Sequence, residues 1–417
     1  MKRTTIPKFS LIIILLLLCR LLLAQNFSDL PILEKNQIGR LVATRTAVPV
    51  GIAKFRLRGS NAHVGNLFGF SVAVSGDTVV VASHGYWNHP GGAYVFVKPA
   101  TGWQDMTETA ELTGTGWQGA VGFSSVAISG NTIIAGPSVD GFGAYIFEKP
   151  SGGWVNMTQT ATLNVDQQLG TVFSVALSGN TAVLGYANGD QAGVAAVFAR
   201  PSGGWHDMTQ TAILTASDGQ IGDQLGTSVA IDGNTVVVGA PFATINSVWA
   251  GALYVFVRPA SGWSDMTQSA KLTPPHASHG QLGYSASINS NSIVSSADGS
   301  VYLFARPETG WADMTPTAAL SPPNGQALIG CAAISGDVVV AGSTGPYPQN
   351  YGEVYAFLKP QRGWQTTSSP NAYYSGNPSA GPQELGYSIA VSGTKAVAGA
   401  AWFDNGVGAA YVFAPRQ

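Results

Sequence analysis

Short apolar runs separated by polar turns make up the hydrophobic pattern of this chain from about residue 51 onward. Between Leu225 and Leu272, a run of small and β-branched residues leads to a Gly-Asn turn, the run Thr235–Ala240, a loop, an aromatic run over 252–257 and a last short apolar run. β-branched and aromatic residues bounded by Gly, Asn and Pro are typical of strands. The stretch therefore predicts four strands.

The strand-turn-strand part of this pattern occurs seven times, with 46 to 57 residues between successive turns. Repeats of this length with four strands each are typical of β-propeller blades. In Gly76-Asp77 and its equivalents, glycine supplies the positive φ that a two-residue II′ hairpin needs. The fifth copy has Ser290-Asn291 instead, which predicts an altered turn. The copies begin at Gly69, Gly122, Val172, Gly226, Gly283, Ile329 and Gly386.

Two further features repeat in the second half of each unit. The third strand carries a Tyr and a Phe two positions apart, as in Tyr254 and Phe256. Side chains at this spacing share one face of a strand, where they can pack between neighbouring blades. A Gly-Trp pair follows, and in five copies a Met, as in Trp263 and Met266. We interpret the Trp and the Met as a hydrophobic plug under each blade.

Seven copies of the first three strands are matched by six copies of the Gly-Trp pair and fourth strand, so the last blade is one strand short. The run Gly51–Leu57 precedes the first blade as Ala110–Leu112 precedes the second, and it is expected to supply that strand. Closure of this kind removes free sheet edges. We predict an all-β protein: a seven-bladed β-propeller over 51–417, with four antiparallel strands per blade and an N-terminal strand completing blade seven.

The N-terminal segment 1–24 has the pattern of a signal peptide. Basic residues precede the apolar run Leu11–Leu18, and Ala24 offers a cleavage site. Arg20 makes that region irregular, so an uncleaved membrane anchor is the alternative. Residues 25–50 lack a periodic pattern and are expected to form a leader or linker. The expected location is secreted and extracellular, or periplasmic, with membrane contact only if the segment is uncleaved.

Charge and cysteine content narrow the function classes. Loss of the four basic residues of the signal segment would leave 16 basic and 22 acidic residues, which gives no support to nucleic-acid binding. Cys331 would then be the sole cysteine, without an intrachain disulfide partner. We interpret it as a buried small residue rather than a nucleophile.

Several repeated strings resemble FG-GAP repeats, which form the propeller of integrin alpha chains and of many secreted bacterial proteins. They are Gly239-Ala240-Pro241, the opening Phe68-Gly69, and the forms Gly-x-Ser-Val-Ala and Gly-Ala-x-Tyr-Val-Phe. The resemblance covers nearly the whole chain beyond the N-terminal segment and implies a propeller. The integrin form places an Asp-rich calcium loop between the first two strands of some blades. Here that connection is about two residues long, so calcium sites are not expected.

Irregular aromatic and acidic residues gather in the connections from second to third strand and from fourth strand to the next blade. In a propeller these connections share one side of the ring, which we call the loop face. Exposed rings beside carboxylates suit stacking on sugars or anchoring a protein partner. The predicted binding residues are Tyr86, Trp87, Phe142, Tyr186, Trp249, Tyr351, Trp402, Asp140, Asp190, Asp298 and Asp404.

We predict a binding or adhesion module that recognises an extracellular protein or a glycan through the loop face. The alternative is a polysaccharide-active enzyme, a hydrolase or lyase, that uses acids on the same face. The chain has neither the Ser-x-Asp-x-Gly-x-x-Trp box of sialidases nor a Gly-x-Ser-x-Gly elbow, so no catalytic residue is assigned. Loop histidines such as His276 and His279 match no strong zinc spacing, and no metal or cofactor is expected.

Overall fold

The computed structural model describes residues 52–85, 91–115, 122–138, 143–165, 169–323, 330–344, 351–376 and 383–415. The chain divides into two units, Met1–Ala47 and Val48–Gln417, and all described elements belong to the second. The predicted signal peptide and leader lie outside the described residues. Within the part of the chain that is described, no helix has the length and hydropathy needed to cross a membrane.

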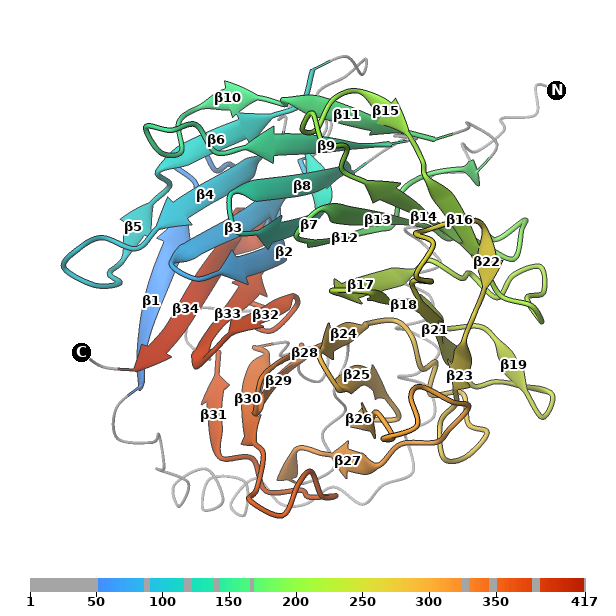
Figure 1. Cartoon of the computed structure of the whole chain (residues 1–417). Coiled ribbons are helices and arrows are strands. Elements are labelled where there is room, and N and C mark those ends of the chain that lie inside the picture. The colour runs from blue at the N-terminus through green and yellow to red at the C-terminus, as the bar shows by residue number, and fades with distance from the viewer. Residues whose placement is uncertain are drawn as a thin grey trace, which may run out of the picture. The chain divides into compact units, whose positions relative to one another are not determined.

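Seven sheets are arranged around a common axis as the blades of a propeller (Figure 1). In blade one the strands run outward from the axis in the order β2, β3, β4 and β6, and each pairs antiparallel with the next. Their bounds are β2 (Phe68–Ser75), β3 (Thr78–Ser83), β4 (Ala93–Val97) and β6 (Ala110–Thr113).

The other blades repeat this order, which confirms the predicted fold class. Blades two to four comprise β7 (Phe123–Ser129), β8 (Thr132–Pro137), β9 (Gly143–Glu148), β11 (Ala161–Asn164); β12 (Ser174–Ser178), β13 (Thr181–Tyr186), β14 (Val194–Ala199), β16 (Ala212–Thr215); and β17 (Ser228–Asp232), β18 (Thr235–Ala240), β21 (Ala252–Val257), β23 (Ala270–Leu272). Blades five to seven comprise β24 (Ser287–Asn289), β25 (Ser292–Ala297), β26 (Ser300–Ala305), β27 (Ala318–Leu320); β28 (Cys331–Ser335), β29 (Val338–Ser343), β30 (Glu353–Leu358), β31 (Ala372–Ser375); and β32 (Ile389–Ser392), β33 (Lys395–Ala400), β34 (Ala409–Pro415) with β1 (Ile52–Arg58).

The ring closes as predicted, because the N-terminal strand completes blade seven. β1 pairs antiparallel with β34 from Ile52 opposite Pro415 to Leu57 opposite Ala410. The innermost strands β2, β7, β12, β17, β24, β28 and β32 each pack against the next, and β32 packs against β2. The circle of blades is therefore continuous.

Two-residue turns join the first and second strands. Gly76 has φ 54°, and the residue after it does not have a positive φ, as expected of a II′ hairpin. Ser290 of blade five keeps this left-handed conformation, with φ 46°, where a side chain is strained. Its N–H donates to Asp232 Oδ2 of blade four at 2.5 Å. The altered turn is thus a serine held in the backbone conformation that glycine adopts elsewhere.

The aromatic third strand packs between blades, as predicted. Tyr145 and Phe147 of blade two lie in one cluster with Val80 and Val95 of blade one. Trp154 joins the same cluster and is 5% exposed. The repeated Trp therefore fills the junction between two blades, which corrects the expectation of a plug beneath each one.

The Met of each Gly-Trp segment joins the sheet of the preceding blade. The short strands β5 (Met106–Thr107), β10 (Met157–Thr158), β15 (Met208–Thr209) and β22 (Met266–Thr267) pair in parallel with β1, β6, β11 and β16. The side chain before the Met accepts a hydrogen bond from the same outer strand, as Asp207 Oδ1 does from Thr162 N–H at 2.8 Å. Four sheets therefore have five strands rather than four.

The junction between blades six and seven differs, because blade seven takes its outer strand from the N-terminus and has no Gly-Trp segment. The described residues of its cluster include neither Trp nor Met. Tyr374 holds the position of Leu112 in blade one, and its ring lies 4.5 Å from that of Phe413. A tyrosine thus fills part of the space that an indole fills elsewhere.

Candidate functional site

In blades one, four, five and seven, the glycine that opens the repeat locks the blade against the preceding one. Gly283 of blade five has φ 108°, and a Cβ at this position would lie 2.9 Å from Ala240 N and 3.1 Å from Gly239 Cα of blade four. Real Cβ atoms seldom come so close, so a glycine is required here. Leu282 also forms a parallel bridge with Gly251 of blade four. The Leu-Gly or Phe-Gly pair that precedes an innermost strand thereby packs against the Gly-Ala backbone of the preceding blade.

In these blades the contact fixes the residue that follows the glycine. This residue stands six positions before the two-residue turn, at the loop-face end of the innermost strand. Because the innermost strands form a closed ring, seven such residues surround the axis, and we call them the collar. Four of the seven are aromatic, in blades one, three, five and seven. The collar consists of Phe70, Ser124, Phe173, Thr227, Tyr284, Gly330 and Tyr387.

The aromatic residues of the collar form an uncharged surface. The rings of Phe70 and Tyr387 lie 5.1 Å apart across the closure of the ring, and His84 lies 4.8 Å from Phe70. Burial lowers the pKa of His84, so its imidazole is neutral at pH 7. Phe173 is 38% exposed. Uncharged rings that remain partly exposed can stack on a sugar face or an apolar side chain.

The predicted tryptophans are exposed but lie far apart in the ring. Trp249 is 60% exposed on the hairpin of β19 (Thr244–Ile245) and β20 (Val248–Trp249), with its ring 6.5 Å from that of His279. Trp402 is 47% exposed and precedes the short helix α3 (Phe403–Gly406). They belong to blades four and seven, which lie on opposite sides of the axis (Figure 1). The two rings do not form one patch.

The predicted carboxylates are also dispersed. Asp190, Asp298 and Asp404 are exposed, in the second-to-third-strand connections of blades three, five and seven. Asp298 accepts a hydrogen bond from Ser278 Oγ at 2.5 Å. Because they belong to three blades, these acids do not form a carboxylate pair.

Tyr186 is fully buried among residues of blades two and three, so it contributes to the core rather than to the loop surface. It ends β13 just before the loop, and for that reason the sequence did not distinguish it from an exposed loop residue. Tyr351 is half-buried next to β30. The remaining predicted residues lie outside the described part of the chain: Tyr86, Trp87, Phe142 and Asp140.

The sequence prediction did not identify the collar, although a signal was available. In blades one, four, five and seven the collar residue comes directly after the repeated glycine, and in the other blades it has the same spacing from the turn. The residue type varies at that position while the strand that follows repeats. Variation inside a regular scaffold is typical of a recognition position.

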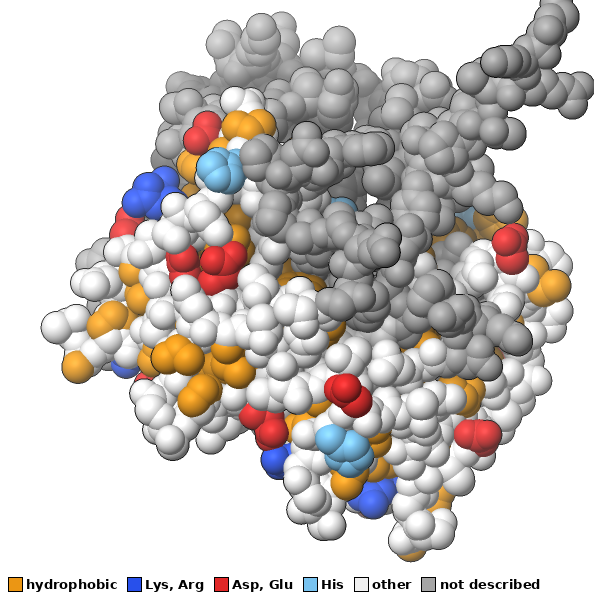
Figure 2. Space-filling view, turned by 90° about the horizontal axis from the view of Figure 1, so that it is seen from above, with side chains coloured by type: hydrophobic (Ala, Val, Ile, Leu, Met, Phe, Trp, Pro, Cys, Tyr) orange, Lys and Arg blue, Asp and Glu red, His pale blue; other side chains and the backbone are white. Residues whose placement is uncertain are grey.

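Figure 2 shows the molecule turned by 90° from Figure 1, and on the surface that it shows in colour acidic and basic side chains are scattered among uncharged ones, with some of opposite charge side by side. The described residues contain no group of three or more His, Cys, Asp or Glu side chains that could share a metal ion. The collar, by contrast, consists of uncharged residues alone.

Comparison with known families gives a match to the FG-GAP repeat over residues 54–96 and 208–256. The first interval runs from the ring-closing strand β1 to the third strand of blade one, and the second ends in the third strand of blade four. No curated protein matches the chain.

Proposed function

Because the chain is an FG-GAP repeat β-propeller, we propose that it is a binding module that recognises an extracellular protein or a glycan through its loop face. The observation that supports the proposal is the collar. Aromatic residues stand at the loop-face ends of four of the seven innermost strands, and every blade contributes one residue to this ring. Ligands of ring-shaped folds gain most from such a place because one ligand contacts several blades at once.

The exposure of the collar favours recognition over core packing. Phe173 is among the few large apolar side chains that remain exposed on the described surface. Exposed aromatic residues of this kind are enriched at sites where one partner covers them. Trp249 and Trp402 stand on separate blades and would contact only a partner wide enough to extend from the collar to the rim.

The first test is a binding screen of residues 25–417, which include the whole propeller, on a glycan array and against extracellular proteins, with and without a chelator. The screen should yield a saturable ligand whose binding Phe173→Ser weakens by a factor of roughly two to ten, because one aromatic stacking contact contributes roughly 0.5–1.5 kcal/mol. Val155→Ser is the matched control, since Val155 is 51% exposed in a connection on the opposite side.

Each alternative has a distinct result. If Trp249→Ser and Trp402→Ser weaken binding and Phe173→Ser does not, the rim rather than the collar is the contact surface. If none of the three variants changes binding, the proposal that the ligand binds at the loop face is wrong. Loss of binding with the chelator would show a metal-dependent site that this proposal does not contain.

The polysaccharide-active alternative depends on the acids of the loop face. Among these, Asp223 is 6% exposed, and burial raises the pKa of its carboxyl, as a general acid requires. Its Oδ2 nevertheless accepts a hydrogen bond from Gln220 N–H at 2.9 Å within the same loop, which is a structural contact. Turnover of a bound glycan that Asp223→Asn abolishes, while binding persists, would support the enzyme instead.

A further inference from the structure

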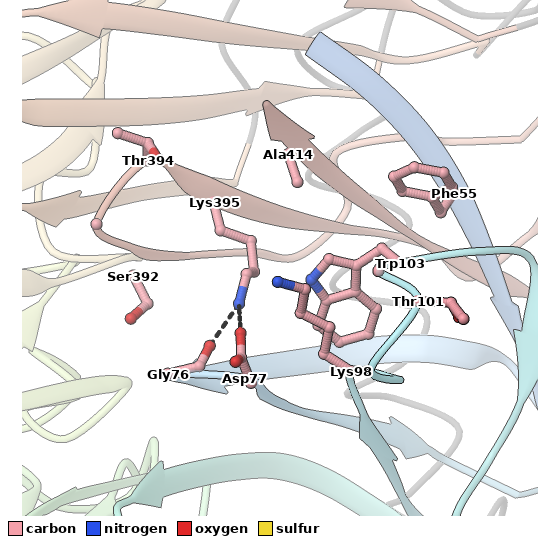
Figure 3. Close-up of a pocket in the computed structure, with 12 residues that line it drawn as sticks. Phe55, Gly76, Asp77, Lys98, Thr101, Trp103, Ser392, Thr394, Lys395 and Ala414 are labelled. Carbon is pink, nitrogen blue, oxygen red and sulfur yellow. Dashed lines mark hydrogen bonds and ion pairs between the residues drawn. The ribbon is translucent and has the colours of Figure 1, made fainter. Parts of the chain in front are cut away.

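A cavity of about 520 Å³ lies where the ring closes, between blades seven and one. It is on the side of the first-to-second-strand turns, opposite the collar, and we call it the closure pocket. Cavities of this size accommodate small ligands. The side chains that give it its chemistry are Lys98, Lys395, Asp77, Trp103 and Phe55 (Figure 3).

The closure pocket exists because this junction is built differently from the others. Elsewhere the first N–H of a turn donates to the side chain that ends the innermost strand of the preceding blade, as Gly130 N–H does to Ser75 Oγ at 3.2 Å. Between Gly76 of blade one and Ser392 of blade seven, both of which are described, no such bond is formed. The equivalent bonds at the other junctions are Gly179 to Ser129, Gly233 to Ser178, Ser290 to Asp232, Gly336 to Asn289 and Gly393 to Ser335.

A lysine crosses the gap instead. Lys395 begins β33 at the position where the other second strands begin with Thr, Ser or Val. Its Nζ donates to Gly76 O at 2.5 Å and to Asp77 Oδ1 at 3.1 Å, and lies 5.2 Å from the centre of the Trp103 ring. Figure 3 shows this side chain crossing from the blade-seven turn to the blade-one turn. The ammonium holds the two blades together beside an open space.

The charges lining the closure pocket do not cancel. Lys395 and Lys98 contribute two ammonium groups, and Asp77 contributes one carboxylate. The hydrogen bond from Lys395, and more weakly the charge of Lys98, lower the pKa of Asp77, so it is ionised at neutral pH. Within the described ranges Lys98 forms no ion pair, and its head group lies beside the Trp103 ring in Figure 3. One positive charge is left over in a cavity that has apolar walls.

We propose that the closure pocket binds a small monocarboxylate, with the carboxylate at Lys98 and Lys395 and the carbon body against Trp103 and Phe55. A single excess positive charge matches a monoanion better than a dianion. The hydroxyls of Thr101, Ser392 and Thr394 line the same cavity and suit a ligand that carries hydroxyl groups. An aromatic acid and a uronic acid share this chemistry.

Isothermal titration calorimetry of residues 25–417 with benzoate and with glucuronate tests the proposal. Benzyl alcohol and glucose are the matched uncharged probes. At least one acid should bind tenfold or more tightly than its uncharged analogue, and added salt should weaken that binding. The stronger acid identifies whether an aromatic or a sugar body is preferred. Equal affinity of each acid and its uncharged analogue would overturn the proposal.

Two lysine variants locate the site. Lys98→Gln should weaken binding of the preferred acid about tenfold, because it removes the ammonium that has no ion-pair partner. Lys149→Gln changes the equivalent residue at the end of the third strand of blade two and should leave binding unchanged. Thermal midpoints of both variants show whether folding is intact. Equal effects of the two variants would place binding outside the closure pocket.

Discussion

At the scale of single residues, Cys331 shows how one position serves several blades. Ser228 Oγ donates to Gly283 O of the next blade at 2.7 Å, and Cys331 Sγ makes the equivalent contact with Gly386 O at 3.0 Å. Desolvation raises the pKa of this thiol to about 12. The thiol is therefore a weak structural donor in the place of a serine, and it stays protonated at neutral pH.

Cys331 is half-buried, and its thiol should react with Ellman's reagent at pH 8 at least a hundredfold more slowly in the native than in the unfolded chain, because the raised pKa suppresses the thiolate. Cys331→Ser should leave the free energy of unfolding within about 0.5 kcal/mol, and Cys331→Ala should lower it by about 1 kcal/mol. Labelling of the native protein at the unfolded rate would contradict the raised pKa of the thiol.

At the scale of elements, the Gly-Trp segment joins one blade to the next. Each of its tryptophans that fills a junction leaves the indole N–H without an acceptor in the described structure, so ring volume rather than a hydrogen bond accounts for the residue. The polar residue two positions later holds the outer strand of the preceding blade: Asp207 Oδ1 accepts from Thr162 N–H, and Asn156 Oδ1 from Glu111 N–H. The shape of the indole ring and one hydrogen bond to the outer strand together fix how the two blades pack at the junction.

Asp207 offers a comparison within the molecule, because blade two uses Asn156 for the same contact. Asp207→Asn should therefore change the free energy of unfolding by less than about 0.5 kcal/mol, and Asp207→Ala should lower it by about 1 kcal/mol through loss of an exposed hydrogen bond. Denaturant titration measures both. If Asp207→Asn lowered the free energy of unfolding as much as Asp207→Ala, the charge of Asp207, and not its acceptor oxygen, would hold the strand.

At the scale of the whole molecule, we expect the junction between blades six and seven to be the weakest of the ring. The groove between blades six and seven is lined by apolar side chains, including Val340, Val391 and Ala396, at the place where the other junctions hold an indole. The strand β32 is only half-buried along its length, whereas β12 has a fully buried centre. Lower local burial gives a lower free energy of local opening.

Hydrogen exchange followed by mass spectrometry should show this difference. Amides of β31 and β32 should exchange about tenfold or more faster than those of β11 and β12, which flank a junction that holds Trp205. The peptides are matched in position, since each pair joins an outer strand to the next innermost strand. Uniform protection around the ring would show that Tyr374 replaces the missing indole fully.

The sequence contains the fold almost completely, because each blade repeats its strand types and a count of strands reveals the closure by β1. It locates the binding residues less well. Tyr186 and the collar residue Phe173 both border loops, and their opposite burial depends on which side of a strand faces the next blade. The closure pocket forms between Lys98 and Lys395, at opposite ends of the propeller sequence. Contacts between blades determine the burial of Tyr186, the exposure of Phe173 and the presence of the closure pocket. The periodicity of the sequence within one blade does not reveal these contacts.

The pairing of β1 with β34 also orders events during synthesis. Ile52 is translated long before its partner Pro415, and at ordinary translation rates the delay is on the order of tens of seconds. For that interval blades can form along the nascent chain, but the first strand has no partner edge. The β34 edge of a second chain that is complete but whose own β1 has not yet paired could be taken instead, so crowded synthesis would favour strand-exchanged dimers of this protein.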